Sequence, residues 1–172
     1  MKDRFNAFYT NPGSKIFTQF NEGVLDKLLK DVRGPALDLG CGRGELTIQL
    51  IKRGYEVTAT DVSSVALDIA RKNLGDLKAK LIETESVPDG EYGVIFAKLL
   101  IYTIQDRQKF YKDVHNHLDK DGAFIIMTPV YKKNQDIYVD KAELERDLMA
   151  EFGNFEIVEE LPGSLLIYKV KA

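Results

Sequence analysis

The sequence has few of the features that are typical of secreted proteins or of membrane proteins. It has one cysteine, no tryptophan and five prolines among 172 residues. The lone Cys41 cannot form a disulfide within the chain, which favours a reducing compartment. No apolar run reaches the roughly 18 residues of a membrane span, and residues 1–15 lack the apolar centre of a signal peptide. We therefore expect a cytoplasmic location and no membrane partner.

Basic charge is also scarce. Twenty-four lysines and arginines stand against 27 acids, giving a formal net charge of -3, and no block of five basic residues occurs. Proteins that bind nucleic acids in a general way cluster lysine and arginine on one face. We therefore expect no nucleic-acid partner. Hydrophobic residues make up 44% of the chain, which is enough for a packed core.

The length and the lack of a linker favour one domain over residues 1–172, with an N-terminal arm and helix over 1–34 and a core over 35–172. Short apolar runs alternate with helical patterns, which predicts an α/β fold with helices on both faces of a sheet. We expect a Rossmann-like three-layer sandwich with a mostly parallel seven-stranded sheet and a C-terminal antiparallel hairpin. The expected strands are 35–39, 55–61, 79–83, 92–100, 123–128, 154–160 and 165–171; the expected helices are 15–30, 45–53, 63–74, 105–118 and 141–152; residues 1–14 are expected to form a loop or a short helical arm.

A glycine loop follows the first expected strand, with glycines at Gly40, Gly42 and Gly44. Its G-x-G-x-G spacing lacks the third glycine of the dinucleotide pattern G-x-G-x-x-G, because Glu45 stands there. Asp38 and Glu45 bracket the loop, and their charges disfavour a diphosphate at the start of the next helix. They favour a cation or a hydrogen-bond donor, and S-adenosylmethionine supplies both as a sulfonium and an α-ammonium.

A third acid ends the second expected strand. Asp61 lies about twenty residues past the glycines, where an acid accepts hydrogen bonds from ribose hydroxyls. Val62 is placed to lie against an adenine face. The alternative for Asp38 and Asp61 is that each only caps the helix that follows it.

These stretches resemble a known family. "LDLGCGRGELTIQL" and "GYEVTATDVSSVALDIARKN" are similar to the first two motifs of class I S-adenosylmethionine-dependent methyltransferases of the small, single-domain type. The resemblance continues through "ETESVPDGEYGVIFAKLLIYTIQD" and "FYKDVHNHLDKDGAFIIMT", and so covers roughly residues 35–130. It implies methyl transfer from S-adenosylmethionine. The cofactor-binding residues implied are Asp38, Gly40, Cys41 and Gly42 near the methionine part, Asp61 and Val62 near the ribose and adenine, Glu83 and Thr84 at the adenine amino edge, and Ala97 through its carbonyl.

Two positions depart from the family pattern. The family often opens the fourth strand with Phe-Asp, where this chain has Tyr92-Gly93, and we interpret that acid as partly structural. Lys98 ends the fourth strand, where a positive charge beside a sulfonium is unfavourable. It is therefore expected to point away from the cofactor or to bind an anionic substrate, unless it is a solvated or structural lysine.

The acceptor is expected to be a small molecule. The Asn-Pro-Pro-Tyr type motif of enzymes that methylate base amines is absent, and no Pro-Cys nucleophile occurs. The candidate acceptor residues are Tyr9, Lys98 and Tyr102, with the aromatic arm as a lid and residues 128–138 as a further source of specificity. Methyl transfer by in-line displacement relies on positioning and desolvation, so no catalytic residue is predicted.

Other functions stay open at this point. A nicotinamide-dependent oxidoreductase would share the fold and the ribose acid, and a binding protein could hold the cofactor without transferring methyl. A metal site at His115 and His117 is disfavoured because residues two apart on a helix point to nearly opposite sides. The sequence leaves the oligomeric state undetermined.

Overall fold

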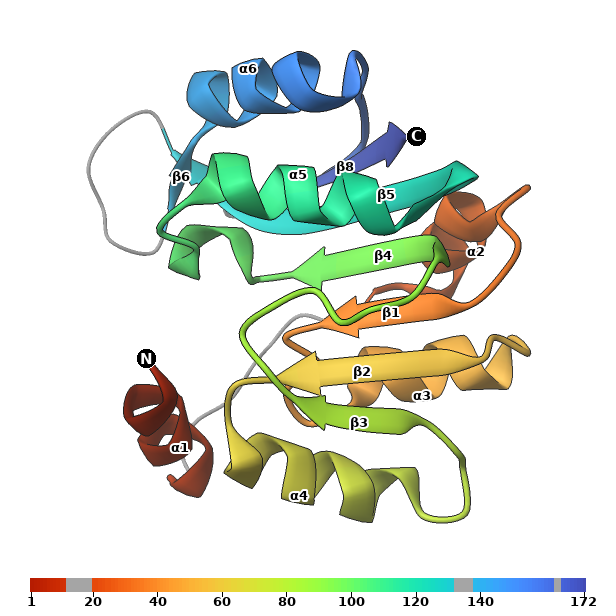
Figure 1. Ribbon diagram of the computed structural model, residues 1–172, viewed down its shortest axis with the longest axis vertical. Helices are drawn as coiled ribbons and strands as arrows, with labels where there is room; N and C mark the ends of the chain where they lie inside the picture. The colour runs from red at the N-terminus through yellow and green to blue at the C-terminus, as the bar shows by residue number, and fades with distance from the viewer. Residues whose placement is uncertain (12–19, 132–137, 163–164) are drawn as a thin grey trace.

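The computed structural model describes residues 1–11, 20–131, 138–162 and 165–172 of the chain. A central sheet crosses the molecule with helices on both sides (Figure 1). Its strands are β1 Ala36–Leu39, β2 Val57–Asp61, β3 Lys80–Glu83, β4 Tyr92–Lys98, β5 Leu118–Tyr131, β6 Val139–Asp140, β7 Glu156–Leu161 and β8 Leu165–Lys171. The helices are α1 Lys2–Thr10, α2 Glu22–Leu29, α3 Glu45–Lys52, α4 Ser64–Leu74, the 3-10 turn η1 Ile101–Thr103, α5 Arg107–His117 and α6 Lys141–Phe152.

The order of strands in the sheet is β3-β2-β1-β4-β5-β8-β7, and the short β6 pairs with β5 outside this path. Strands β3, β2, β1, β4 and β5 run parallel. Strand β8 is antiparallel to β5, and β7 pairs antiparallel with β8. The predicted Rossmann-like sheet with a closing antiparallel hairpin is confirmed, and β6 is the strand that the sequence did not indicate.

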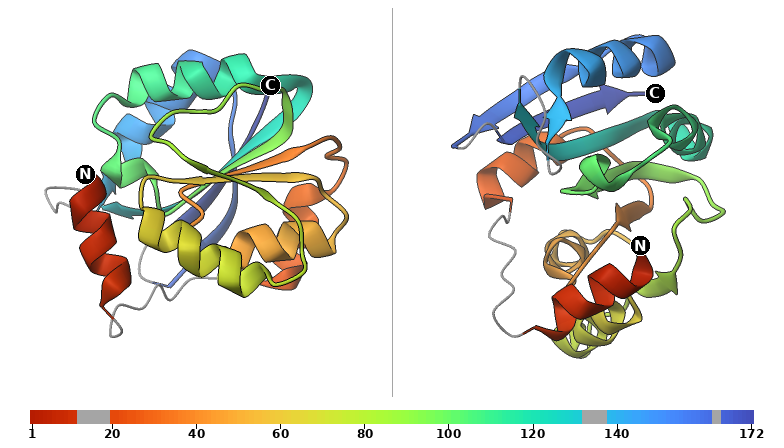
Figure 2. Two further views of the ribbon diagram at one scale, coloured as in Figure 1. Left: turned by 60° about the horizontal axis from the view of Figure 1, so that its bottom comes forward. Right: turned by 90° about the vertical axis from the view of Figure 1, so that its left-hand side faces the viewer.

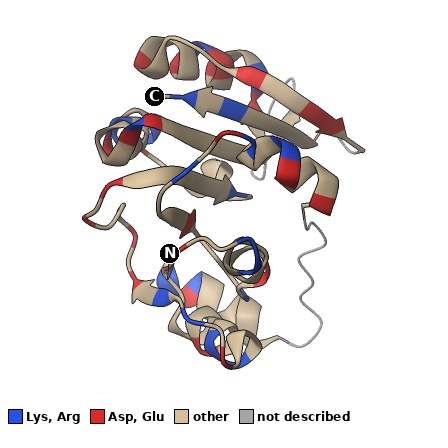
Figure 3. Ribbon diagram, turned by 90° about the vertical axis from the view of Figure 1, so that its right-hand side faces the viewer, with Lys and Arg blue, Asp and Glu red and all other residues tan. Residues whose placement is uncertain are grey.

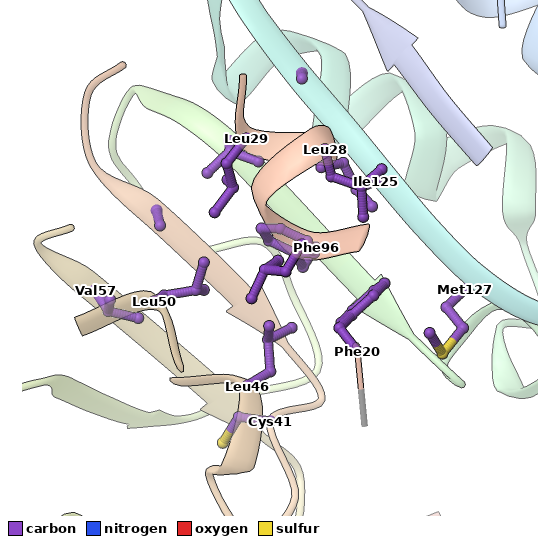
Figure 4. Packing of buried hydrophobic residues seen from close by; sticks show 14 of the residues in the cluster. Phe20, Leu28, Leu29, Cys41, Leu46, Leu50, Val57, Phe96, Ile125 and Met127 are labelled. Atoms are coloured by element: carbon purple, nitrogen blue, oxygen red, sulfur yellow. The ribbon is translucent and has the colours of Figure 1, made fainter. Parts of the chain in front are cut away.

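Two hydrophobic clusters fill the two sides of the sheet. Helices α2, α3 and α4 cover one face, where Phe96 of β4 packs among leucines of α2 and α3 (Figure 4). Helices α5 and α6 cover the other face, where Tyr111 and Leu148 pack against β4, β5 and β8. The two further views of Figure 2 show these layers. Strands β1 and β4 are buried on both faces, as expected for parallel strands with helices on either side.

Local capping explains several helix starts. Ser63 caps α4 by accepting a hydrogen bond from the Ala66 amide at 3.1 Å, as serine commonly does at the start of a helix. The helix expected over 15–30 begins only at Glu22, because Asn21 takes the cap position and its side chain accepts from the Gly23 amide at 2.9 Å. Residues 12–19 of that expected helix lie outside the described residues.

Charges of both signs are spread over the helices and strands (Figure 3). The outer strand β7 carries three acids, Glu156, Glu159 and Glu160, which oppose pairing of this edge with another strand. Within the described ranges, no helix has the length and apolar character needed to cross a membrane.

Candidate functional site

The parallel strands β1 to β4 end at one edge of the sheet, the left-hand edge in Figure 1. The strand order reverses between β1 and β4, since β2 lies on one side of β1 and β4 on the other. Ligands of open α/β sheets bind outside the carboxyl ends of strands at such a switch point. The glycine loop after β1 lies at this point.

The glycine loop needs its glycines for conformation and for space. Gly40, Gly42 and Gly44 have φ angles of 67°, 55° and 83°, in the left-handed region that side chains disfavour. A Cβ atom on Gly40 would lie 3.1 Å from Cδ1 of Leu100, and one on Gly44 would lie 3.2 Å from Cβ of Ala70. The loop therefore packs closely against its neighbours while its backbone turns toward the edge of the sheet.

Asp38 lies at the base of the loop and is 1% exposed. Its Oδ2 accepts a hydrogen bond from the Thr47 hydroxyl of α3 at 2.7 Å. Burial raises the pKa of this carboxyl to about 6, against the Thr47 hydrogen bond, which lowers it. Gly44 takes the cap position of α3 and no side chain caps it. Asp38 therefore does not cap the helix backbone, which removes the alternative interpretation of this residue.

Asp61 ends β2 and is 6% exposed. Its two carboxylate oxygens accept from the Gly42 amide at 3.0 Å and from the Ser63 amide at 2.9 Å. Burial raises the pKa of Asp61, and these backbone hydrogen bonds oppose the rise. Because a carboxylate accepts about four hydrogen bonds, Asp61 keeps capacity for a ligand while it holds the glycine loop. Ser63, not Asp61, caps the following helix.

Several negative charges lie around the loop. Their effects on one another indicate which kind of ligand this place can hold. Burial is the largest cause that raises the pKa of the Cys41 thiol, and the charges of Asp38 and then of Asp61 raise it further. Asp61 and Glu45 also raise the pKa of Asp38. A cation at this place would relieve that repulsion, and a diphosphate would increase it. The residues present therefore fit a ligand with a sulfonium and an ammonium group.

The end of β3 completes the site on the side of β2. Glu83 pairs in register with Asp61 and is exposed, and the Lys2 ammonium of α1 forms an ion pair with it. The Thr84 amide donates to the Asp61 carbonyl at 3.2 Å, and the Thr84 hydroxyl accepts from the Ser86 amide at 3.0 Å. Val62 is half-buried beside Asp61. These residues lie at the predicted adenine end, and their roles toward a ligand stay predictions.

The end of β4 borders the loop on its other side. Ala97 pairs in register with Leu39 and its side chain is wholly buried, so that only its backbone can serve a ligand. The positive charge of Lys98 lowers the pKa of Asp38 against the effect of burial. Lys98 is half-buried, and its role toward a ligand stays a prediction.

Helix α1 lies next to α4, at the carboxyl ends of β2 and β3 (Figure 2, right). Besides the Lys2 ion pair, the Ser63 hydroxyl donates to the Asn6 side-chain oxygen at 2.7 Å. Tyr9 is 8% exposed. Its burial is the main cause that raises its pKa, and the charge of Asp61 is the second cause. Burial also raises the pKa of Tyr102, and Arg4 of α1 opposes that rise. Tyr9 of α1 thus lies within electrostatic range of Asp61, and Tyr102 of η1 within range of Arg4; their contact with an acceptor stays a prediction.

Several contacts of the site have no motif in the sequence. Thr47 is a buried polar residue on the face of α3 that otherwise carries leucines, and this isolated hydroxyl is a signal that could have identified the partner of Asp38. Lys2 and Asn6 carry no such signal. Of the segment 128–138, residues 132–137 lie outside the described residues.

The two histidines are engaged separately. His115 Nδ1 lies 2.9 Å from Oε1 of Glu151, and His117 Nδ1 lies 2.7 Å from the Asp113 carbonyl oxygen. In the part of the chain that the structure describes, no group of three or more His, Cys, Asp or Glu residues is placed to hold a metal ion.

Comparison with known proteins adds an independent observation. A family profile described as "Methyltransferase domain" matches residues 37–126. The chain is 29% identical over 161 residues to a ribosomal protein L11 methyltransferase of Acetivibrio thermocellus, covering 87% of this chain and 48% of that protein. The ribosomal protein L11 methyltransferase of Campylobacter fetus is 35% identical over 129 residues, 72% of this chain and 41% of that one. The chain thus spans about half the length of these relatives.

A solved structure shares the fold over nearly all of the chain. It is the magnesium protoporphyrin IX methyltransferase of Synechocystis PCC 6803 with bound S-adenosylmethionine. The TM-score is 0.70 at 14% sequence identity, with 98% of this chain and 89% of that chain covered.

Proposed function

This chain belongs to the class I S-adenosylmethionine-dependent methyltransferase family, and we propose that it transfers a methyl group from S-adenosylmethionine to a small-molecule acceptor. The observation that carries the proposal is the pair of buried carboxylates at the glycine loop. Asp38 and Asp61 are both nearly inaccessible, and Asp61 holds the Gly42 amide at 3.0 Å. The family match sets aside the nicotinamide-dependent alternative.

Each residue of the site has a role in the proposal. Asp61 would accept hydrogen bonds from the ribose hydroxyls, and Asp38 would attract the α-ammonium. The backbones of Gly40, Gly42 and Ala97 would approach the methionine part, and Cys41 fills a small buried place beside it. Val62, Glu83 and Thr84 would border the adenine. When bound, the cofactor supplies an already activated methyl group on a positively charged sulfur.

The protein's contribution is then positioning and exclusion of water. The Thr47 hydroxyl and the Gly42 amide fix the two carboxylates, which keeps the ligand in one orientation. Helix α1 would shield the adenine end of the site from solvent through its contacts with Glu83 and Ser63. Tyr9 of α1 and Tyr102 of η1 are the remaining candidates at this end of the sheet, and we propose that they contact the acceptor.

The nature of the acceptor has two candidates. Buried Tyr9 of α1 and half-buried Tyr102 of η1 would leave little room for a large acceptor, which favours a small molecule. A protein acceptor is the second candidate, because the relatives named above are ribosomal protein methyltransferases. The two candidates can be distinguished, because the transferred methyl groups accumulate either in small molecules or in protein.

Calorimetry and a labelled methyl group test the proposal. S-adenosylmethionine and its demethylated product should both bind, and label should pass to the small-molecule filtrate of a cell extract. Label in the protein fraction would favour the protein acceptor. Tight binding without transfer to any fraction would favour a protein that holds the cofactor without catalysis, and no binding of either nucleoside would reject the proposal.

Cofactor affinity should depend on pH through Asp38. Its folded-state pKa of about 6 lies above the ordinary 3.8, so its contribution to folding stability is present at low pH and is lost as pH rises through about 6. Cofactor binding has the opposite sign, because only the ionised carboxylate attracts the ammonium. Below that pKa the affinity should fall by up to about tenfold for each pH unit. Calorimetry with the demethylated product across this range measures the effect.

Asp38→Asn is the control for this prediction. The amide cannot ionise, so the variant should bind more weakly at neutral pH and should lose most of the pH dependence. A pH dependence equal to that of the unchanged protein would show that another group is responsible.

Removal of residues 1–11 should speed release of the demethylated product. The deletion removes Tyr9 and the contacts of Lys2 and Asn6 with the strand ends. Changes of this kind act mainly on dissociation rates. A loss of about 1.4 kcal/mol of binding free energy would therefore speed release of the product about tenfold. Stopped-flow measurements would show this, with Asp3→Ala on the exposed side of α1 as the matched control. An unchanged release rate would contradict a covering role for α1.

A further inference from the structure

Asp38 and Lys98 lie on the same face of neighbouring parallel strands. Asp38 of β1 pairs in register with Phe96 of β4, and Lys98 is two residues beyond Phe96. Side chains alternate between the faces of a strand, so that Phe96 and Lys98 share one face. This is the face that α2 and α3 cover, and the Thr47 hydrogen bond places Asp38 on it as well. The carboxylate and the ammonium therefore belong to one corner of the site.

The backbone after β4 fixes the position of Lys98. Leu99 has a φ angle of 55°, a conformation rare for leucine, and its amide donates to the Met127 carbonyl at 2.7 Å. Such strained residues persist where the surrounding structure holds them, and they cluster at functional sites. Toward the core, on the same face of the sheet, the Phe20 ring packs on Phe96 at a centroid distance of 5.7 Å (Figure 4).

We propose that Lys98 binds the α-carboxylate of the methionine part of S-adenosylmethionine, while Asp38 accepts a hydrogen bond from its α-ammonium. The inference rests on the proposed function and adds a residue to its cofactor site. An α-amino acid carries one negative and one positive group on a single carbon. A lysine and an aspartate on the same face of adjacent strands, two residues apart in register, present the complementary pair. Lys98 is then a positioning residue that sets the orientation of the methionine part.

The same assignment accounts for a lysine close to a sulfonium. Two cations alone would repel each other. A carboxylate bound by Lys98 neutralises its charge on that side, and Asp38 acts on the ammonium. The rival interpretation is that Lys98 binds an anionic acceptor. Its shared face with buried Asp38, at the first strand of the site, favours the methionine carboxylate instead.

The test compares two ligands that differ in one group. S-adenosylmethionine has the α-carboxylate, and decarboxylated S-adenosylmethionine lacks it but keeps the ammonium and the sulfonium. Lys98→Met should weaken binding of S-adenosylmethionine by about tenfold, the size expected for a charge-assisted hydrogen bond. It should leave the affinity for the decarboxylated ligand the same or slightly higher. Lys98→Arg should restore most of the loss.

Lys120→Met is the matched control. Lys120 is exposed and belongs to the start of β5, at the opposite end of the sheet, so both ligands should bind this variant as they bind the unchanged protein. Calorimetry gives all affinities without requiring turnover.

The outcomes separate the inference from the proposed function. If the unchanged protein binds neither ligand, the proposed function fails. If it binds both, and Lys98→Met binds both equally well or loses both to the same extent, the carboxylate assignment is overturned and the proposed function stands. Unchanged cofactor affinity with reduced transfer to anionic acceptors would also overturn it and would place Lys98 at the acceptor.

Discussion

Asp61→Ala is expected to lower the affinity for S-adenosylmethionine by about a hundredfold. The proposed role of Asp61 is to accept two hydrogen bonds from ribose hydroxyls in a nearly solvent-free position. Each hydrogen bond to a charged group contributes about 1.5 kcal/mol at the lower end of measured values. Two such bonds amount to about 3 kcal/mol, which corresponds to the stated loss. Calorimetry with the demethylated product measures it.

The substitution also has a structural consequence, which the experiment has to separate. Asp61 accepts from the Gly42 and Ser63 amides, and its removal leaves two buried donors without this partner. Asp61→Asn keeps the shape and one acceptor oxygen, so it should lose about tenfold in affinity with less effect on folding. Thermal unfolding of each variant shows whether a loss of binding reflects a loss of structure.

Asp68→Ala is the matched control for Asp61. Asp68 lies on α4 with its side chain 68% exposed and forms an ion pair with Arg71. Its replacement should leave cofactor affinity and stability nearly unchanged. If Asp61→Ala bound the cofactor as tightly as Asp68→Ala does, the assignment of Asp61 to the ribose would be wrong.

The second large effect is expected for stability at Gly93. A Cβ atom on Gly93 would overlap the Arg33 carbonyl oxygen and would lie 2.6 Å from its carbon. The backbone turn before β1 therefore packs directly on β4, and the Gly93 amide donates to the Pro35 carbonyl at 2.9 Å. Gly93→Ala should push this turn away and lower the free energy of unfolding by about 3 kcal/mol or more. Denaturant titration followed by circular dichroism measures it.

A glycine without such contacts gives the comparison. Gly54 has a φ angle of 85°, and a Cβ atom added to it would meet no other atom within 4 Å, so Gly54→Ala tests conformational strain alone. That strain should cost about 1 kcal/mol. A Gly93→Ala variant that is no less stable than Gly54→Ala would contradict the predicted clash, whereas a variant that does not fold would agree with it.

The contact at Gly93 also explains the departure from the family pattern. The family often has an acid at this position, and any side chain there requires space beside the strand. In this chain the Arg33–Gly34 turn occupies that space. The change to glycine is therefore linked to the packing of this turn, and the cofactor side of the sheet is unaffected because Gly93 lies near the amino end of β4.

Short-range patterns explain the success of the sequence-based fold prediction. Strand β1 and the glycine loop follow each other directly, and α3, α4 and α6 show helical periodicity between clear start and stop residues. The errors occur where a local pattern is weak. Residues 20 and 21 of the helix expected over 15–30 are not helical, because Asn21 caps α2, and β6 is only two residues long and exists through its pairing with β5.

The candidate site, like the fold, could be predicted from the sequence only in part. Asp38, Gly40, Gly42 and Asp61 could be proposed from sequence because the loop chemistry and the strand ends are local features. The geometry of these residues could not be derived from the sequence. The hydrogen bond from Gly42 to Asp61 and the ion pair of Lys2 with Glu83 join residues that are far apart in the chain. Strand register and helix docking set such contacts, and neither can be derived from periodicity.

The sequence alone thus determined the type of fold, the glycine loop and the acids that disfavour a diphosphate, because periodicity, glycine spacing and charge act within a few residues. Only the tertiary structure decided that Lys98 shares a face of the sheet with Asp38, that α1 reaches the ends of β2 and β3 and that Asp61 anchors the loop. These depend on which strands are neighbours and on their register. The physical reason is that a parallel sheet aligns the ends of strands that are separated along the chain, and so combines groups that no local pattern connects.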